Sequence, residues 1–300
     1  MSVRDSIFAE QPPGVPPTDL KRLARLAGVL YLAVAITGGF AEGYLGPSLY
    51  VAGDAAATAG NLVANPALVR LGVVAHLADA VFFVLTAITL YVLLKHISKH
   101  AARLMVLPVV IAAGLKASST VFMFVALQVA TTDTYLLAFR GEQTNALALL
   151  LLEIEHYGIR AAQVFFALWL TPLGYLAYRS RLFPKPLGII LVVATVSYLL
   201  DVAVAFLFPD IAGQIHTYFT VVPAIAEIWM LLYLLTIGVR TPRTPLQPPP
   251  LDAANPGVIT GSANLGPSAL GDADGPSRTV GGCNYWASAS QELQLANACR

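Results

Sequence analysis

Seven ionisable residues lie inside long apolar segments of this sequence, where a charged side chain is costly. They are Glu42, His76, Asp79, Lys116, Arg160, Asp201 and Glu227. A charged group in the middle of a membrane costs roughly 3 kcal/mol on insertion scales, so each one needs a partner, a water-filled cavity or a function. The carboxylates outnumber the fixed cations, Lys116 and Arg160. Surplus acids of this kind are what proton relays and cation sites require.

Helical spacing gathers these residues into polar stripes, because positions three, four or seven apart share one face of a helix. The stripes are Tyr31, Gly38 and Glu42; Gly72, His76, Asp79, Phe83 and Thr86; Lys116, Ser119 and Thr120; Glu153, His156, Arg160 and Gln163; and Ser197 with Asp201. Polar stripes on membrane helices face the interior of the bundle. We therefore expect the seven residues to surround one polar cavity that opens toward the outer face, with Lys116 neutralised by Asp79, Asp201 or Glu227.

Packing alone is an alternative explanation of the same residues. Polar groups inside membranes often form interhelical ion pairs and hydrogen bonds that only fix the arrangement of helices. This explanation accounts for Lys116 and Arg160 but leaves acids in excess. It describes a structural or accessory protein that contacts another membrane protein through small residues on lipid-facing stripes. The candidates for such contacts are Gly38, Gly72, Gly114 and Gly174.

Metal chemistry is a second alternative, in the form of an intramembrane metal-dependent enzyme. His76, His156 and His216 could gather with Asp79 around zinc, but their spacing matches no ligand signature, so bonded or solvated histidines are favoured. Glu153-x-x-His156 is one half of a di-iron helix motif, and its single copy favours a surface position. No phosphate loop, dinucleotide fingerprint or nucleophile elbow occurs in the sequence. We therefore expect no cofactor and assign no catalytic residue.

The elements that must position these residues are membrane helices. Apolar residues make up 57% of the 300 residues and charged residues only 12%, against averages of about half and about a quarter for soluble domains. The apolar residues form blocks close to the roughly 20 residues that cross a bilayer as a helix. We predict an all-α, six-helix transmembrane bundle, with spans at about 26–45, 71–94, 104–130, 157–178, 187–208 and 220–239. The lipid bilayer is then the expected partner, and a net charge of +1 gives no reason to expect nucleic acid.

Orientation follows from the basic residues in the short connections, because the side that carries more of them is cytoplasmic. One side carries Arg4, Lys21, Arg22, Arg25, Lys95, Lys99, Arg103, Arg179, Arg181, Lys185, Arg240 and Arg243. The other side carries only Arg70 and Arg140. Both ends of the chain are therefore predicted to be cytoplasmic.

The flanking segments differ from the apolar domain, which we place at residues 23–240. We expect residues 1–22 to form a disordered N-terminal arm and residues 241–300 a disordered tail, because neither offers a periodic apolar face. Both cysteines, Cys283 and Cys299, lie in that tail, so no disulfide framework is expected. Between the first two spans, Asp54 is placed to cap a short Ala-rich helix that Pro66 closes off.

A family resemblance rests on four stretches of this sequence: RLARLAGVLYLAVAITGGFAE, GDAAATAGNLVANPALVRLGVVAHLADAVFFVLTAITLYVLLK, LGYLAYRSRLFPKPLGIILVVATVSYLLD and AEIWMLLYLL. The chain resembles the bacterial integral membrane family called domain of unknown function 4386 over about residues 20 to 240, with GDAAATA, LYVLLK and YRSxxxPxxLG as its most specific motifs. The resemblance implies a multi-pass protein of the bacterial cytoplasmic membrane. It implies no activity and no catalytic residues.

Together these observations place binding or transport of a small solute or proton ahead of catalysis. The surplus acids from four different spans carry this expectation. An accessory role and a metal-dependent enzyme remain as alternatives, while the substrate and any protein partner stay open.

Overall fold

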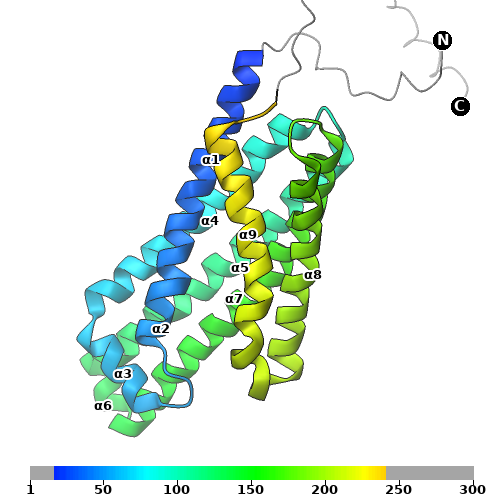
Figure 1. Cartoon of the computed structure of the whole chain (residues 1–300). Coiled ribbons are helices and arrows are strands. Elements are labelled where there is room, and N and C mark those ends of the chain that lie inside the picture. Colours follow the sequence, from blue (N-terminus) through cyan, green and yellow to red (C-terminus); the bar gives the residue numbers. More distant parts are fainter. Residues whose placement is uncertain (1–16, 241–300) are drawn as a thin grey trace, which may run out of the picture. The chain divides into compact units, whose positions relative to one another are not determined.

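The computed structural model describes residues 17–240, which form helices and short turns and contain no strand. The helices in chain order are α1 (Pro17–Gly38), the π-helix η2 (Gly39–Leu45), α2 (Gly46–Leu49), α3 (Ala55–Ala64), α4 (Pro66–Leu94), α5 (Lys99–Thr131), α6 (Asp133–Ala138), α7 (Gly141–Arg179), α8 (Lys185–Leu207) and α9 (Pro209–Thr236). Figure 1 shows how the long helices run alongside one another. The predicted all-α class is confirmed for this part of the chain.

Six helical segments of the described chain are long and apolar enough to cross a membrane, as predicted. The first is continuous through α1, η2 and α2 (Asp19–Leu49), and the others are α4, α5, α7, α8 and α9. Helix α1 begins at Pro17, inside the stretch 1–22 that we expected to be disordered. The rest of that arm and the tail 241–300 lie outside the described residues.

The observed helices extend beyond the predicted spans, most clearly in α7 and α9. Helix α7 begins at Gly141 rather than near 157, and α9 begins at Pro209 rather than near 220. Hydropathy marks only the stretch that matches the bilayer core, whereas caps decide where a helix starts. Pro209 in the first turn of α9 and Asp210 beside it are favourable start signals. The predicted Ala-rich helix is confirmed as α3, because the Asp54 side chain accepts a hydrogen bond from the Ala57 backbone N–H at 2.9 Å.

Two apolar cores lie one after the other along the bundle. The larger contains Phe83, Leu90, Met105, Trp169, Leu173 and Met230 among its buried residues. The smaller lies against α3 and contains Leu45, Leu62, Val69, Met123, Leu127 and Leu152. On α4, the stretch between Val69 and Phe83 carries His76 and Asp79. His76 and Asp79 therefore lie in a layer between the two cores.

Helices α1 and α9 touch at one end and separate toward the other. A Cβ atom at Gly28 would lie 3.0 Å from the backbone nitrogen of Leu235, so only glycine allows this close approach. Gly238, with a φ of 73°, ends α9 next to the Lys21 carbonyl. From this contact the two helices diverge toward the end of the bundle that carries α2 and α3 (Figure 1). The divergence leaves room between them for a cavity.

Candidate functional site

A cavity of about 670 Å³ occupies the space between the diverging halves of α1 and α9. Of the seven predicted site residues, Glu42, His76, Asp79, Lys116, Arg160 and Glu227 line it. Asp201 is not in the lining but binds Arg160, which is. The described structure therefore brings all seven residues to the cavity or directly behind its wall. Its volume lies within the roughly 300–1,000 Å³ typical of small-molecule sites.

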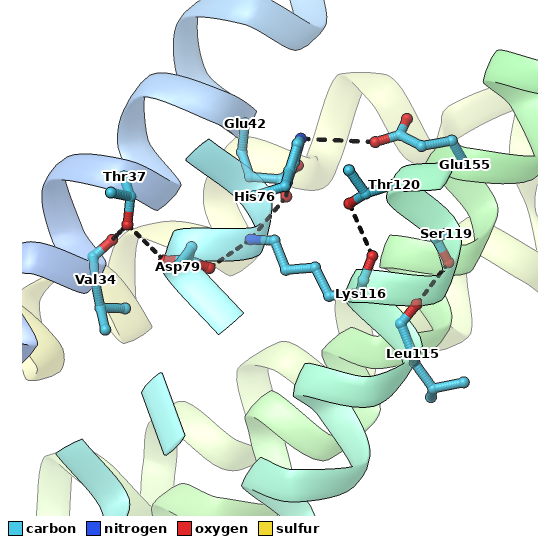
Figure 2. Close-up of polar contacts among 10 residues, drawn as sticks. All are labelled: Val34, Thr37, Glu42, His76, Asp79, Leu115, Lys116, Ser119, Thr120 and Glu155. Atoms are coloured by element: carbon cyan, nitrogen blue, oxygen red, sulfur yellow. Dashed lines mark hydrogen bonds and ion pairs between the residues drawn. The ribbon is translucent and has the colours of Figure 1, made fainter. Parts of the chain in front are cut away.

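Lys116 of α5 is the cation of the first polar cluster, and only 3% of its surface is exposed. Its Nζ atom lies 2.7 Å from Asp79 Oδ2 and 3.2 Å from Glu42 Oε1. Thr37 of α1 donates a hydrogen bond to Asp79 Oδ1 at 3.2 Å. Figure 2 shows Lys116 reaching between α4 and α1 to meet both acids. Of the three acids expected as partners, Asp79 is the one that neutralises Lys116, and Glu42, which was not among them, is a second partner.

Gly38 makes room for this cluster on α1. A Cβ atom there would lie 3.0 Å from Asp79 Oδ1, so the carboxylate rests directly against the helix backbone. Gly72 likewise faces Leu45, and Gly174 faces the Gly188 carbonyl. These three glycines pack inside the chain rather than on lipid-facing stripes. Gly114 alone among the four predicted contact residues has open space around it.

His76 of α4 lies between two carboxylates and is almost fully buried, with 1% of its surface exposed. Nδ1 is 3.6 Å from Glu42 Oε1, and Nε2 is 3.7 Å from Glu155 Oε1. Both distances exceed a normal hydrogen bond. Within the described residues, Nδ1 is a buried polar atom without a hydrogen-bond partner. Because such atoms are normally satisfied, we expect water or a ligand to reach this nitrogen from the cavity.

Glu42 connects this cluster to the outside of the protein. Its side chain is 46% exposed, whereas the side chains of its partners Lys116 and His76 are nearly buried. It lies in η2, a π-helix within the first spanning segment. π-Helical turns are rare and occur often at functional sites. Glu42 is therefore the member of the cluster that meets solvent first.

Arg160 of α7 forms a separate cluster with Asp201 of α8. Arg160 Nη1 and Gln163 Nε2 donate to Asp201 Oδ2 at 3.2 and 2.8 Å. His216 Nδ1 lies 2.8 Å from the other carboxylate oxygen. The Asp201 side chain is buried, so both of its oxygens are satisfied by these partners. This cluster is neutralised within itself.

Glu227 of α9 differs from the other acids in its partners. Tyr31 donates a hydrogen bond to Oε2 at 2.8 Å, and Tyr198 donates to Oε1 at 3.1 Å. Both partners are neutral phenols. No Lys, Arg or His side chain of the described residues forms an ion pair with Glu227. This carboxylate faces the cavity without a basic partner.

The three histidines proposed as metal ligands do not come together. His76 lies near Glu42 and Glu155, His216 binds Asp201, and the His156 ring stacks on Tyr50 with centroids 5.4 Å apart. Within residues 17–240, no group of three His, Cys, Asp or Glu side chains is placed to hold a metal ion. His156 also lines the cavity, so the surface position expected for it is wrong.

Tyr50 follows α2 and lines the cavity at the end that carries the exposed Glu42, which we call its mouth. Its ring stacks on the His156 ring. Burial, and after it the charge of Glu153, raises the pKa of the Tyr50 hydroxyl. The phenol therefore stays neutral at physiological pH and offers a hydrogen-bond donor at the mouth.

Sequence reasoning missed Glu155 and most of the aromatic lining. Glu155 is buried and lines the cavity. Glu153 of the same helix is not among the residues that line it. A signal was present, because Glu155 lies three positions from buried Leu152 and seven from buried Ala162. That spacing puts Glu155 on the packed face of α7. The aromatic residues Phe166, Trp169 and Tyr198 looked like ordinary apolar core and gave no comparable signal.

The family model described as "Domain of unknown function (DUF4386)" matches residues 26–238. The match covers well over half of the chain, so the chain belongs to this family, and the resemblance found in the sequence is confirmed. No curated protein and no solved structure matches the chain. The family's description names no activity, and the function must be argued from the site.

Proposed function

We propose that this member of the family is a membrane protein that binds a small solute in the cavity between α1 and α9, as a carrier or a receptor. The observation that carries the proposal is the imbalance of charge at one cavity. Five carboxylates, Glu42, Asp79, Glu155, Asp201 and Glu227, lie at or behind its wall among the described residues, against the fixed cations Lys116 and Arg160.

Packing alone accounts for part of this arrangement. Asp79 pairs with Lys116, and Asp201 pairs with Arg160 and His216, as expected of groups that only hold helices together. Glu155 is left with a distant histidine, and Glu227 with two phenols. Keeping an acid away from bulk water without a cation is costly. Stability alone would therefore favour uncharged residues at Glu155, which is buried, and at Glu227, which is partly buried. The unpaired acids therefore support a binding role over a purely structural one.

The cavity would open on the outer side of a bacterial cytoplasmic membrane. The basic residues gather at the end of the bundle where α4 turns into α5 and α7 into α8, and the positive-inside rule makes that end cytoplasmic. The mouth with Glu42 and Tyr50 would then face outward. A solute or proton would reach the buried acids from that side.

Cysteine accessibility tests whether the cavity is open to water. Cys283 and Cys299 are first replaced by serine, and then Val34→Cys, which lines the cavity, is compared with Ile36→Cys, which does not. Ile36 lies two residues closer to the proposed outer end and is 62% exposed in the protein alone, so a bilayer would cover it. A membrane-impermeant charged thiol reagent added outside should modify the cysteine at 34 and spare the one at 36.

The Ile36→Cys control excludes depth in the membrane as the cause of a difference in reactivity. Position 36, which should be protected, lies closer to the outer face than position 34, which should react. An unreactive cysteine at 34, or equal reaction at both positions, would mean that no water-filled cavity opens between α1 and α9, and the proposal would fail.

A further inference from the structure

Glu227 is the acid of this cavity that forms no ion pair with any Lys, Arg or His side chain of the described residues. Its two oxygens accept hydrogen bonds from Tyr31 and Tyr198. Hydroxyl donors reduce the cost of a partly buried carboxylate such as Glu227 but bring no opposite charge. The two fixed cations of the cavity are already engaged, Lys116 by Asp79 and Glu42 and Arg160 by Asp201. Glu227 therefore needs either a proton or a cation from outside the chain.

The walls around Glu227 are aromatic. Tyr31, Phe83, Phe166, Trp169 and Tyr198 all line the same cavity. Four of these rings pack together. The Trp169 ring centroid lies 5.8 Å from that of Tyr31 and 5.0 Å from that of Phe83, and the Phe83 centroid lies 5.3 Å from that of Phe166. Tyr198 joins them through its hydrogen bond to Glu227. Aromatic faces attract cations through their quadrupole, most strongly where water is excluded. Lys116 Nζ, 5.9 Å from the Phe166 ring centre, already shows a cation beside one of these rings.

We propose that the inner end of the cavity binds an organic cation of the alkylammonium type, with Glu227 as its counter-ion and the aromatic residues as its walls. This inference rests on the proposed function and names its ligand class. Aromatic cages of this composition suit ammonium groups that carry alkyl substituents, because the substituents pack on the rings while the charge faces the carboxylate.

The same walls argue against other ligands. Ca²⁺ takes roughly six to eight oxygen ligands, largely carboxylates and carbonyls, whereas the Glu227 carboxylate is accompanied here by two phenols. An anion would meet Lys116 and Arg160 only after displacing their acids. The apolar side chains of Val34, Ile228 and Leu231 also line the cavity, and they fit the alkyl part of an organic cation.

Fluorescence of Trp169 provides the readout, because this ring lies in the cavity wall. The sequence has three tryptophans, so Trp229→Phe and Trp286→Phe leave Trp169 as the single reporter. The first probe is choline. The second is its neutral analogue, in which carbon replaces the ammonium nitrogen. The third is the carboxylate that corresponds to this neutral analogue, which carries no ammonium group. Choline should change the fluorescence in a saturable way, and the two analogues should bind at least about tenfold more weakly.

Variants assign the binding to Glu227. Glu227→Gln keeps the size and the hydrogen-bonding ability of the side chain but removes its charge, and should weaken choline binding about tenfold or more. Glu227→Asp keeps the charge and should retain the preference for choline. Glu153→Gln is the matched control, because Glu153 is on α7 but does not line the cavity. If Glu227→Gln does not fold, the comparison of choline with its neutral analogue on the parent protein still decides.

The outcomes separate the two proposals. Binding of the carboxylate in place of choline would overturn the cation site but leave solute binding intact. Failure of all three probes, in a protein whose cysteine at 34 reacts from outside, would also overturn the cation site alone. A closed cavity in the cysteine experiment would overturn both.

Discussion

Lys116 holds two acids in very different surroundings. Asp79, 2.7 Å from its ammonium group, is buried, whereas Glu42, 3.2 Å away, is about half exposed. Water can solvate Glu42 if the lysine is lost, but it cannot reach Asp79 in the same way. The cost of losing Lys116 therefore falls mainly on Asp79, because a buried charge without its partner is strongly destabilising.

Replacing Lys116 by methionine should lower the free energy of unfolding in detergent by about 3 kcal/mol. Methionine keeps much of the lysine's apolar volume but leaves Asp79 unpaired. Adding Asp79→Asn should restore much of the loss, because the amide carries no charge. Chemical unfolding of the parent, both single variants and the double variant measures the coupling between the two residues.

Lys99→Met is the control, since Lys99 is exposed at the start of α5 and should change stability little. If Lys116→Met is neutral, or if Asp79→Asn shows no coupling to it, the buried ion pair contributes nothing and the cluster needs another explanation.

Individual site residues were predictable where their charge contrasted with the apolar residues around them in the sequence. Lys116 and Asp79 are charged residues in apolar segments, so the sequence alone marks them for the bundle interior. Which of Asp79, Asp201 and Glu227 would pair with Lys116 was not predictable, because a stripe fixes the face of one helix and not the neighbour that this face meets. Glu155 was missed because its helix continues outward past the apolar block, where a carboxylate looks like a surface residue.

Among the elements, η2 shows why local sequence rules are insufficient. The spacing of Tyr31, Gly38 and Glu42 assumes an α-helical period, yet residues 39–45 form a π-helix. This segment contains Gly39 and Gly43, which are poor helix formers, and it packs Leu45 against Gly72. The contact with α4 belongs to the tertiary structure, so a pattern within η2 alone does not predict the π-helical turn.

The crossing of α7 and α8 depends on two glycines that face each other. A Cβ atom at Gly174 would lie 2.7 Å from the Gly188 carbonyl oxygen, and one at Gly188 would lie 2.7 Å from the Gly174 carbonyl oxygen. Because these contacts involve backbone atoms, the helices must move apart to admit a methyl group. Small residues of this kind let membrane helices approach closely.

Gly174→Ala should therefore destabilise the protein by about 1–3 kcal/mol, the usual cost of overpacking. Gly114→Ala is the matched control, because Gly114 is also in a helix but has nothing within 4 Å of its Cβ position. Alanine is the better helix former by about 1 kcal/mol, so this change should be neutral or stabilising. Thermal unfolding in detergent compares the two variants, and a loss at Gly114 equal to that at Gly174 would contradict the close crossing.

At the scale of the whole described bundle, a polar layer lies between two apolar cores. The larger core includes Phe83 and Trp169 and the smaller one Val69 and Leu152. Between them lie His76 and Asp79 of α4 and Glu155 and Arg160 of α7. Hydropathy predicted the number of spans because crossing a bilayer requires length and apolar character. It did not predict the divergence of α1 from α9, which depends on where Gly28 permits contact. Most of the charged residues that line the cavity were therefore expected, but the two helices between which it lies were not.

The direction of the bundle in the membrane is the last testable point. The start of α1, the turn between α7 and α8 and the end of α9 lie together, because the Arg240 backbone N–H donates to the Leu182 carbonyl at 3.1 Å and Gly238 lies beside Lys21. Lys21, Arg179, Lys185 and Arg240 gather at this end, while Arg70 and Arg140 lie at the other. Reporters fused after Lys99, Pro186 and Arg243 should read as cytoplasmic, and one after Ala64 as external. A reporter that indicates the opposite side of the membrane at any of these positions would contradict the positive-inside assignment. A reversal at all four positions would mean that the mouth of the cavity faces the cytoplasm.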